Sequence, residues 1–348
     1  MTALHGRDIV VVAASAGGLE PLRTLLAALP ADLPASLLVV LHIPATGGRA
    51  LPSILDRSGV LAAAAAEDGE PLRPGRVYVA PADLHLLVVD GLVRTSRGPR
   101  HNGVRPSADP LFRSAALYGG PRTIGVVLSG TLDDAALGAA TVEQQGGCVI
   151  VQDPKEAAYA SMPRCAVATT QHPMIRPAGK IAGLLTRLTH EKVEVRVGER
   201  PADLEEEVRG LLAVDLETIP APRDYSGFTC PECGGPLYHA RKHTADSYDC
   251  LVGHRWSPES LLEEQAGTVE RAMWLAIRSL DERRRLTGRL AESARARGYP
   301  ISAARFRATA AEAALAADVI RDATSKMNPV TEEPAADQLT SGEPDASG

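Results

Sequence analysis

The sequence predicts an α/β protein in which a doubly wound parallel sheet is followed by a small cysteine-rich module and a C-terminal α-helical hairpin. Three observations support this prediction. Over about the first 190 residues, fully apolar runs alternate with helical patterns, which is typical of parallel strands buried on both faces. Three cysteines and a histidine then gather in a short segment. A heptad pattern of apolar residues follows that segment.

The individual elements follow from apolar runs, which predict buried strands, and from amphipathic or alanine-rich segments, which predict helices. Asp90-Gly91 is a hairpin-turn signal, so the run around it should form two antiparallel strands. Ser107 is expected to cap the helix that it precedes. The predicted strands cover residues 8–14, 35–42, 76–81, 84–96, 122–130 and 148–153, and the predicted helices cover residues 17–30, 47–59, 107–119 and 133–147.

Composition limits the class of protein. Apolar residues make up 45 % of the chain but aromatic residues only 3 %, so the core must consist of aliphatic side chains. The net charge of −6 gives no basic field of the kind that binds nucleic acid. Neither a signal-peptide-like beginning nor an apolar run of about 18 residues is present. Together with an odd number of cysteines, five, these features favour a cytoplasmic protein in a reducing compartment.

Polar side chains follow three of the predicted buried strands. Ser15 follows the first and His42 the second, while Thr131, Asp133 and Asp134 follow the strand that ends at residue 130. Ligands of open parallel sheets bind at the carboxyl ends of the strands. Acyl transfer requires a hydroxyl that attacks, an imidazole that accepts its proton, and a carboxylate that orients the imidazole. The sequence therefore predicts a serine hydrolase site.

Each of these residues also has a simpler interpretation. Ser15 could cap a helix, and Gly17 and Gly18 after it could cradle a phosphate, although no G-x-G-x-x-G motif or P-loop lysine is present. His42 could be a loop histidine, and either aspartate could be a helix cap. A strand–serine–helix turn favours the catalytic interpretation, because it exposes the hydroxyl and leaves the first N–H groups of the helix to face a developing oxyanion.

Six blocks of the sequence resemble the catalytic domain of the chemotaxis protein-glutamate methylesterases, the CheB family. They are AASAGG (13–18), LHIPATGG (41–48), VYVAPADLHLLV (77–88), VRPSADPLFRSAA (104–116), VVLSGTLDDAALG (126–138) and VQDPKEAAYASMPRCAV (151–167). The resemblance implies the fold of that domain. It also implies hydrolysis of glutamyl methyl esters on a chemoreceptor or similar methylated signalling protein, with deamidation of glutamine as a second activity.

The resemblance also implies roles for individual residues. The nucleophile, general base and carboxylate fall on Ser15, His42 and Asp134. The carboxylate is Asp134 rather than Asp133 because it stands four residues after Gly130. Backbone N–H groups of Thr131 and, in the turn after the nucleophile, Ala16 are expected to form the oxyanion hole. No cofactor is implied for catalysis.

The chain departs from the family's pattern in two motifs. Ala13 and Ala16 replace a glycine and a hydroxyl residue of G-x-S-[TS]-G-G, which could slow the reaction. Thr131, Leu132 and Ala135 stand at the Met and the two Gly positions of G-M-G-x-D-G. If φ is positive at Leu132 or Ala135, strain of about 1 kcal/mol or more follows. The family's receiver domain does not precede the first strand, so we expect no control by phosphorylation in cis.

The cysteine-rich module carries a metal-ligand pattern. A C-x2-C pair is followed, after a spacer, by C-x3-H, and the four residues are Cys230, Cys233, Cys250 and His254. This spacing predicts a structural zinc site, because four protein ligands leave no open position. His239 and His243 are alternative ligands with poorer spacing, and chance spacing or disulfides are the simpler interpretation. Cys148 and Cys165 are expected to be core thiols.

The predicted organisation has five parts. They are an esterase-type domain (1–192), a charged linker with a short helix (193–226), a zinc-ribbon-like module (227–258), a helical hairpin (259–327) and a disordered acidic tail (328–348). The heptad residues of the hairpin are Leu262, Ala266, Val269, Met273, Ala276 and Leu280, and then Phe306, Ala310, Ala313, Ala317 and Ile320. Such a seam fits helices that pack within one chain or a homodimer through these helices.

Other functions are compatible with the same residues. The loop that contains Arg97, Arg100, His101 and Arg105 is either solvated or a cleft wall that attracts an acidic receptor helix. The protein as a whole could be a non-catalytic signalling scaffold that keeps the esterase fold. It could also be a zinc-ribbon protein of transcriptional regulation, which the small number of basic residues near the module disfavours.

Overall fold

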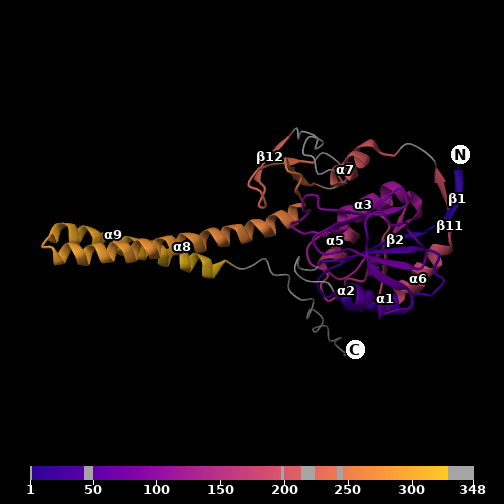
Figure 1. Cartoon of the computed structure of the whole chain (residues 1–348), viewed down its shortest axis with the longest axis horizontal. Coiled ribbons are helices and arrows are strands. Elements are labelled where there is room, and N and C mark those ends of the chain that lie inside the picture. Colours follow the sequence, from indigo (N-terminus) through magenta and orange to yellow (C-terminus); the bar gives the residue numbers. More distant parts are fainter. Residues whose placement is uncertain (1, 43–49, 197–199, 213–223, 241–245, 328–348) are drawn as a thin grey trace, which may run out of the picture. The chain divides into compact units, whose positions relative to one another are not determined.

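The computed structural model describes residues 2–42, 50–196, 200–212, 224–240 and 246–327 (Figure 1). The described residues up to Ser260 form one compact unit, and those from Leu261 onward form a second. The first unit holds the parallel sheet and the cysteine-rich module, and the second consists of two long helical segments. The predicted tail and His243 lie outside the described residues.

Seven parallel strands form the central sheet of the first unit. In order across the sheet they are β10 (Met174–Arg176), β9 (Cys148–Gln152), β8 (Thr123–Val127), β2 (Ile9–Ala14), β3 (Ser36–Leu41), β5 (Arg76–Val79) and β4 (Ala62–Ala65). Strands β2 and β3 bury all of their side chains, as their uninterrupted apolar sequences predict. The chain order reverses at β2, which lies between β3 and β8, so the carboxyl end of β2 is the switch point where ligand sites form.

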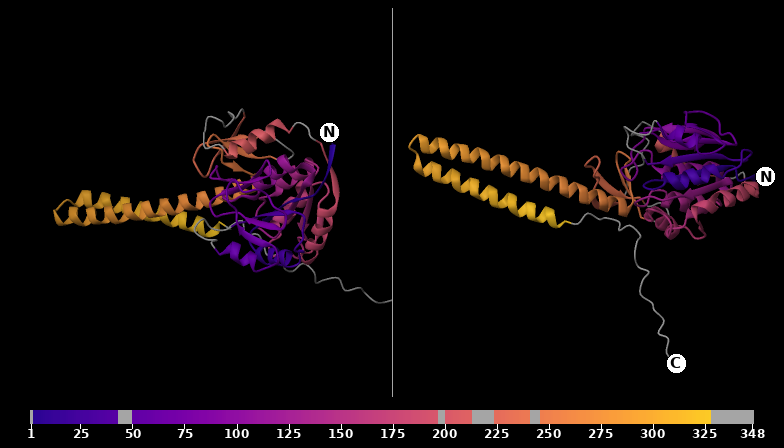
Figure 2. Two further views of the ribbon diagram at one scale, coloured as in Figure 1. Left: turned by 45° about the vertical axis from the view of Figure 1, so that its right-hand side comes forward. Right: turned by 90° about the horizontal axis from the view of Figure 1, so that it is seen from below.

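Helices cover both faces of this sheet (Figures 1 and 2). On one face, α1 (Leu19–Ala27), α2 (Leu51–Asp56) and α6 (Ala178–His190) contribute leucines and isoleucine to an aliphatic core. On the other face, α3 (Ala108–Gly119), α4 (Ala136–Gln144) and α5 (Ser161–Thr169) pack around Phe112. The predicted fold class is therefore confirmed.

Shorter elements complete the sheet domain. Strands β6 (His85–Val89) and β7 (Leu92–Ser96) form the antiparallel hairpin that Asp90-Gly91 predicts, and both turn residues have positive φ. The 3₁₀ turn η1 (Gly120–Arg122) precedes β8, and β1 (Thr2–Gly6) pairs with β11 (Lys192–Arg196). Strand β4 was not predicted, because its four alanines have low strand propensity.

The charged segment after β11 contains the predicted short helix, α7 (Ala202–Leu212), but this helix is packed rather than free. Leu204 and Val208 contact Leu117 of α3 and are almost fully buried. Glu207 on the same helix is also buried, and it forms ion pairs with Arg113 of α3 and with Arg255 of the cysteine-rich module. The linker prediction failed here because α7 has only a narrow stripe of apolar side chains, and the charged residues around them made the segment resemble a solvated linker.

The cysteine-rich module is a four-stranded antiparallel sheet of β12 (Tyr225–Thr229), β13 (Pro236–His239), β14 (Tyr248–Cys250) and β15 (Arg255–Trp256). Few of its side chains are buried, and Trp256 and Leu237 are the large ones among them. Such a small apolar core cannot by itself outweigh the conformational entropy of the segment.

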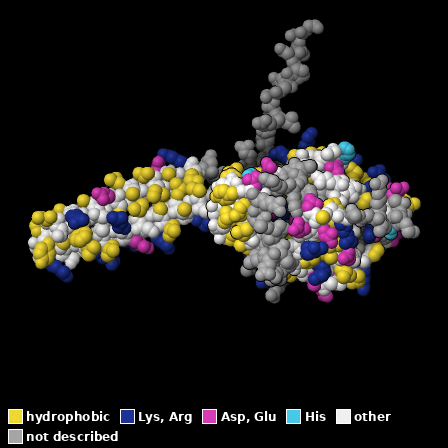
Figure 3. All heavy atoms as spheres, turned by 90° about the horizontal axis from the view of Figure 1, so that it is seen from above, with side chains coloured by type: hydrophobic (Ala, Val, Ile, Leu, Met, Phe, Trp, Pro, Cys, Tyr) yellow, Lys and Arg dark blue, Asp and Glu magenta, His cyan; other side chains and the backbone are white. Residues whose placement is uncertain are grey.

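The second unit is a helical hairpin of α8 (Pro258–Ala296) and α9 (Pro300–Lys326), so the predicted break at Tyr299-Pro300 is confirmed. Small residues are buried along the helices, and Arg321 of α9 pairs with Asp281 of α8 at 2.6 Å. Figure 3 shows many apolar side chains on the surface of the hairpin. Leu262 and Val269 are 59 % and 48 % exposed, so the prediction that they pack in a seam within one chain is wrong.

Among the described residues, none of the helices combines the length and the apolar composition that crossing a membrane requires.

Candidate active site

Ser15 stands at the sharp turn between β2 and α1. Its backbone N–H donates to the carbonyl oxygen of Ser129 at 3.0 Å, which joins the ends of β2 and β8. The N-cap of α1 is Gly18, without a side-chain cap, so the interpretation of Ser15 as a helix cap is wrong. Gly17 has φ of +66° and provides the tight turn that the hydroxyl needs.

Two further residues hold this turn in place, and the sequence analysis missed both. A Cβ on Gly130 would lie 2.8 Å from Cβ of Ser15 and would also collide with Sδ of Met162, so only glycine fits. The hydroxyl of Ser129 donates to the carbonyl oxygen of Ala16 at 2.9 Å and accepts from the N–H of Tyr159 at 3.0 Å. The signal for these roles was the S-G dipeptide that follows β8, which resembles an ordinary turn.

His42 follows β3, the neighbour of β2, and its ring lies between the other two candidate residues. Its Nδ1 is 3.0 Å from Oγ of Ser15, and its Nε2 is 2.7 Å from Oδ2 of Asp134. With the proton on Nε2, the ring donates to the carboxylate and presents a lone pair to the hydroxyl. The structure thus brings together the three side chains that the sequence places 27 and 92 positions apart.

Asp134 lies at the N-terminus of α3 and is buried. Its Oδ1 accepts from the hydroxyl of Ser107 at 2.7 Å, and its Oδ2 accepts from the N–H of Ala108 at 2.6 Å. The prediction that the side chain of Ser107 caps α3 is therefore wrong. The carboxylate of Asp134 accepts from the first N–H groups of the helix instead. Burial alone would raise the pKa of Asp134, but the hydrogen bond with His42 and the donors of α3 hold it below its usual value.

The oxyanion-hole positions lie in the two turns beside Ser15. Ala16 is the next residue along the chain, and Thr131 follows Gly130 after β8. Leu132 and Ala135 have φ of +58° and +77°, so the strained conformation that the sequence analysis considered is present at both. The segment that carries Asp134 is therefore strained on both of its sides.

Asp133, which the sequence analysis considered only as a helix cap, forms side-chain hydrogen bonds outside the triad. Its Oδ1 accepts hydrogen bonds from the hydroxyls of Ser257 at 2.9 Å and Ser260 at 2.8 Å, at the start of α8. Burial raises its pKa to about 6, and the two hydroxyl donors oppose that rise.

Asp109, in the first turn of α3, is a second buried carboxyl group that the sequence analysis missed. Its Oδ1 accepts from the N–H of Gly138 on α4 at 2.6 Å. Burial raises its pKa to about 7, the guanidinium of Arg113 opposes that rise, and the charge of Asp134 adds to it. An aspartate in the first turn of a helix usually indicates a favourable dipole interaction, so nothing in the sequence marked it as buried.

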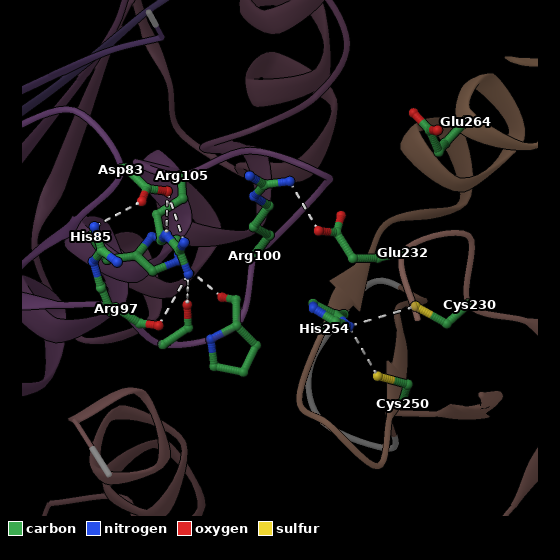
Figure 4. A network of polar contacts seen from close by, with 12 residues as sticks. Asp83, His85, Arg97, Arg100, Arg105, Cys230, Glu232, Cys250, His254 and Glu264 are labelled. Atoms are coloured by element: carbon green, nitrogen blue, oxygen red, sulfur yellow. Dashed lines mark hydrogen bonds and ion pairs between the residues drawn. The ribbon is translucent and has the colours of Figure 1, made fainter. Parts of the chain in front are cut away.

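The arginine-rich loop is engaged within the first unit (Figure 4). Arg105 is held by Oδ1 of Asp83 at 2.7 Å, and Arg100 pairs with Glu232 of the cysteine-rich module at 2.9 Å. His101 is buried, which lowers its pKa well below the usual value. Arg97 also pairs with Asp83, at 3.2 Å, although 73 % of its side chain is exposed. The loop is therefore not simply solvated, and its attraction of an acidic receptor helix stays a prediction.

Cys230, Cys233, Cys250 and His254 form a cluster that could hold a metal ion, since their ligand atoms all lie within 4.8 Å of one another. Figure 4 shows three of them, Cys230, Cys250 and His254. Nδ1 of His254 is 3.8 Å from Sγ of Cys230 and 3.5 Å from Sγ of Cys250. Tetrahedral zinc, with Zn–S of about 2.3 Å and Zn–N of about 2.0 Å, requires edges of about 3.5–3.8 Å.

The other residues considered for this cluster have other surroundings. All five cysteines are free, so the disulfide interpretation is wrong. His239 stacks against Tyr248 with ring centres 5.3 Å apart and does not join the four ligand residues.

Residues 10–185 match the family model described as CheB methylesterase. The chain belongs to the CheB methylesterase family. The match ends before α7, so the cysteine-rich module and the hairpin lie outside the CheB region.

Named relatives match about half of this chain. A protein-glutamate methylesterase/protein-glutamine glutaminase of Symbiobacterium thermophilum is 36% identical over 186 residues, which are 53% of this chain and 51% of that protein. A second one, from Caulobacter vibrioides, is 41% identical over 161 residues, 45% of this chain and 46% of its own length. The alignment thus spans about half the length of these two CheB relatives.

Two shorter proteins match over nearly their whole length. A relative from Leptospira interrogans is 36% identical over 190 residues, 54% of this chain and 98% of its own. The crystal structure of the Thermotoga maritima CheB methylesterase catalytic domain is 34% identical, with a TM-score of 0.49, and covers 52% of this chain and 98% of that one.

Proposed function

We propose that this protein is a serine esterase that removes methyl groups from glutamyl methyl esters of a chemoreceptor or similar methylated signalling protein, and that it also deamidates glutamine side chains there. The observation that carries the proposal is the chain of hydrogen bonds from Ser15 through His42 to Asp134 at neighbouring strand ends. Membership of the CheB family and the names of the relatives support the substrate class.

The first half of the reaction forms an acyl-enzyme. Oγ of Ser15 attacks the carbonyl carbon of the ester, and its proton passes to Nδ1 of His42, 3.0 Å away. The imidazolium that forms is stabilised by Asp134, which is ionised because its pKa lies below the usual value. The same proton then goes to the leaving methoxide, which departs as methanol and leaves an ester on Ser15.

The second half returns the enzyme to its starting state. Water attacks the acyl-serine and gives a proton to His42. The tetrahedral intermediate then collapses to glutamate as that proton passes from His42 to Oγ of Ser15. A glutamine side chain follows the same path with ammonia as the leaving group. The backbone N–H groups of Ala16 and Thr131 supply the oxyanion hole, and among the hydrogen bonds of the described residues neither group has another acceptor.

The cysteine-rich module is proposed to bind one structural zinc ion. The donor set of Cys230, Cys233, Cys250 and His254 and the distances between their ligand atoms support zinc. Four protein ligands leave no position for a substrate, so the ion would supply folding energy rather than chemistry. Free thiols of this kind also support a reducing compartment, the cytoplasm.

Methanol release tests the proposal. The full chain is incubated with the cytoplasmic domain of a chemoreceptor that carries labelled methyl esters. Wild-type protein should release labelled methanol, and Ser15→Ala should lower kcat by about 10⁴-fold or more, because the nucleophile is lost. Mass spectrometry of receptor peptides follows conversion of glutamine to glutamate in the same samples.

The matched control is Ser279→Ala, which removes an exposed serine from α8. It should release methanol at the wild-type rate. If folded wild-type protein releases no more methanol than Ser15→Ala, the esterase proposal fails and a non-catalytic scaffold takes its place.

A further inference from the structure

The segment Leu132–Ala135 bears the catalytic carboxylate in a conformation that its own residues disfavour. Leu132 and Ala135 are not glycine, yet both have positive φ, which costs about 1–2 kcal/mol for each such residue. Asp133 and Asp134 between them are both buried acidic residues. Contacts with the rest of the molecule must therefore hold this segment in place.

Asp134 is held by α3, and Asp133 is held by residues more than 120 positions later in the chain. Both hydroxyls at the start of α8 donate to the same carboxylate oxygen of Asp133, at 2.9 Å from Ser257 and 2.8 Å from Ser260. The hydroxyl of Ser257 also accepts from the N–H of Ser260 at 3.1 Å, which fixes the first turn of the helix. All three side chains are buried.

The serines are in turn connected to the candidate metal cluster. His254 belongs to that cluster, and the three residues after it lie along the loop that contains Asn102. The N–H of Asn102 donates to the carbonyl oxygen of Arg255 at 2.8 Å, and its side-chain oxygen accepts from the N–H of Ser257 at 2.9 Å. The backbone from His254 to Ser257, braced by Asn102, thus leads to the hydrogen bond between Ser257 and Asp133.

We propose that Asp133 is a positioning residue, through which the two serines at the start of α8 keep Asp134 in line with His42 and make the esterase rate depend on the cysteine-rich module. This inference rests on the proposed esterase function. Loss of the serine donors allows the strained segment to relax, and the carboxylate then moves relative to the imidazole. Substrate binding should change little, because the side chain of Asp133 bonds to Ser257 and Ser260.

The test compares three variants of the full chain. Ser257→Ala/Ser260→Ala removes both donors and should lower kcat for methanol release about 10- to 100-fold with little change in KM, because small misplacements of catalytic groups have effects of this size. Asp133→Ala should lower kcat to a similar extent as the serine double variant, because it removes the acceptor of both hydroxyl groups. Asp133→Asn keeps an oxygen acceptor at the Oδ1 position and should retain most of the wild-type kcat, whereas a purely electrostatic role for Asp133 would make it as slow as Asp133→Ala.

Amide hydrogen exchange of residues 130–136 gives a readout that needs no substrate. Exchange in this segment should be faster in Ser257→Ala/Ser260→Ala than in wild-type protein. The far-UV circular dichroism spectrum and the melting temperature should stay close to those of wild type, because the rest of the protein keeps its fold. The matched control, Ser279→Ala/Ser293→Ala, removes two exposed serines from the same helix and should change neither exchange nor kcat.

Removal of the metal completes the experiment. Treatment with 1,10-phenanthroline should lower kcat in wild-type protein but add little to the loss in Ser257→Ala/Ser260→Ala, because both act on one path. The positioning role is overturned if exchange and kcat of the serine double variant match those of an active wild-type protein. An inactive wild-type protein refutes the esterase function instead, and exchange alone then decides whether the serines hold the segment.

Discussion

At the scale of the residue, the site depends on side chains that take no part in the chemistry. Gly130 leaves room for Ser15 by having no Cβ, and Ser129 ties the turn after β2 to the end of β8. Ser107 and the first N–H groups of α3 supply donors that keep Asp134 ionised. Each of these contacts positions either Ser15 or Asp134, the two residues that His42 connects.

Gly130→Ala tests this dependence on space. The added methyl group would collide with Met162 and would lie 2.8 Å from Cβ of Ser15. We expect a loss of about 1–3 kcal/mol in the free energy of unfolding, together with a large loss of methanol release. Thermal denaturation and the methanol assay measure the two effects. Gly179→Ala, at a position where a Cβ would meet nothing within 4 Å, is the control and should leave both unchanged.

Asp109 should make stability depend on pH. Its pKa of about 7 in the folded protein exceeds the ordinary value of 3.8, so the folded state keeps a proton that the unfolded state releases in this window. The contribution of Asp109 to the free energy of unfolding therefore falls as pH rises from about 4 to 7.

Asp109→Asn removes this titration. Relative to wild type, the variant should gain about 2 kcal/mol or more in the free energy of unfolding between pH 5 and pH 8. Urea denaturation at the two pH values measures the difference. Asp32→Asn, at an exposed aspartate, is the control, and an equal gain there would contradict the prediction.

At the scale of the element, the four strands β12–β15 stand out because they enclose so little apolar surface. Their organisation rests on the cluster of three thiols and one imidazole, and on ion pairs such as that of Arg255 with Asp249 at 2.7 Å. A metal ion would cross-link four residues of this segment, which is a stronger constraint than a few buried side chains can supply.

Trp256 of β15 reports on the state of this sheet. It is 1 % exposed, whereas the other tryptophan of the chain, Trp274, is 53 % exposed. In a Trp274→Phe background, chelation of the metal should shift the fluorescence of Trp256 to longer wavelength, because the sheet opens and water reaches the indole. Cys250→Ser should give the shifted spectrum without chelator, and Cys148→Ser, in β9, should behave as the parent. A metal content unchanged by Cys250→Ser would contradict the assignment.

At the scale of the whole molecule, the chain consists of two compact units that differ in construction. The first has a sheet with aliphatic cores on both faces, and the second has a thin seam of small residues between two helices. Units with separate cores are expected to unfold separately.

Two substitutions two positions apart on α9 test this independence. Ala317→Glu places a carboxylate at a fully buried position of the seam and should destabilise the hairpin by about 2–4 kcal/mol. Leu315→Glu changes a side chain that is 68 % exposed and should have little effect. Far-UV circular dichroism follows the melting of the helices. Methanol release should be equal in both variants, and a loss confined to Ala317→Glu would show that the hairpin supports the catalytic unit.

The same scales decide how much the sequence could predict. The strands and the three polar residues after them were predictable, because apolar runs mark buried parallel strands and the carboxyl ends of such strands meet at one edge. The cysteine and histidine cluster was also predictable, because each of its two residue pairs, C-x2-C and C-x3-H, is close together in the sequence.

Contacts between elements could not be predicted in this way. Asp133 and Ser257 are separated by 124 positions, and nothing in either local sequence specifies the other. Tertiary packing likewise determines that α7 contacts α3 and that the carboxylate of Asp134 lies at the start of α3. Leu262 and Val269 were misplaced because a heptad pattern fixes a helical face but not the partner that covers it.

Glu207 ties three segments of the first unit to one another. Its carboxylate on α7 pairs with Arg113 of the sheet domain and with Arg255 of the cysteine-rich module. Without this side chain Arg255 would keep its second partner, Asp249, whereas Arg113 would lose an acidic partner at a buried position. A single carboxylate thus couples the attachment of the helix to the sheet domain with the attachment of the module.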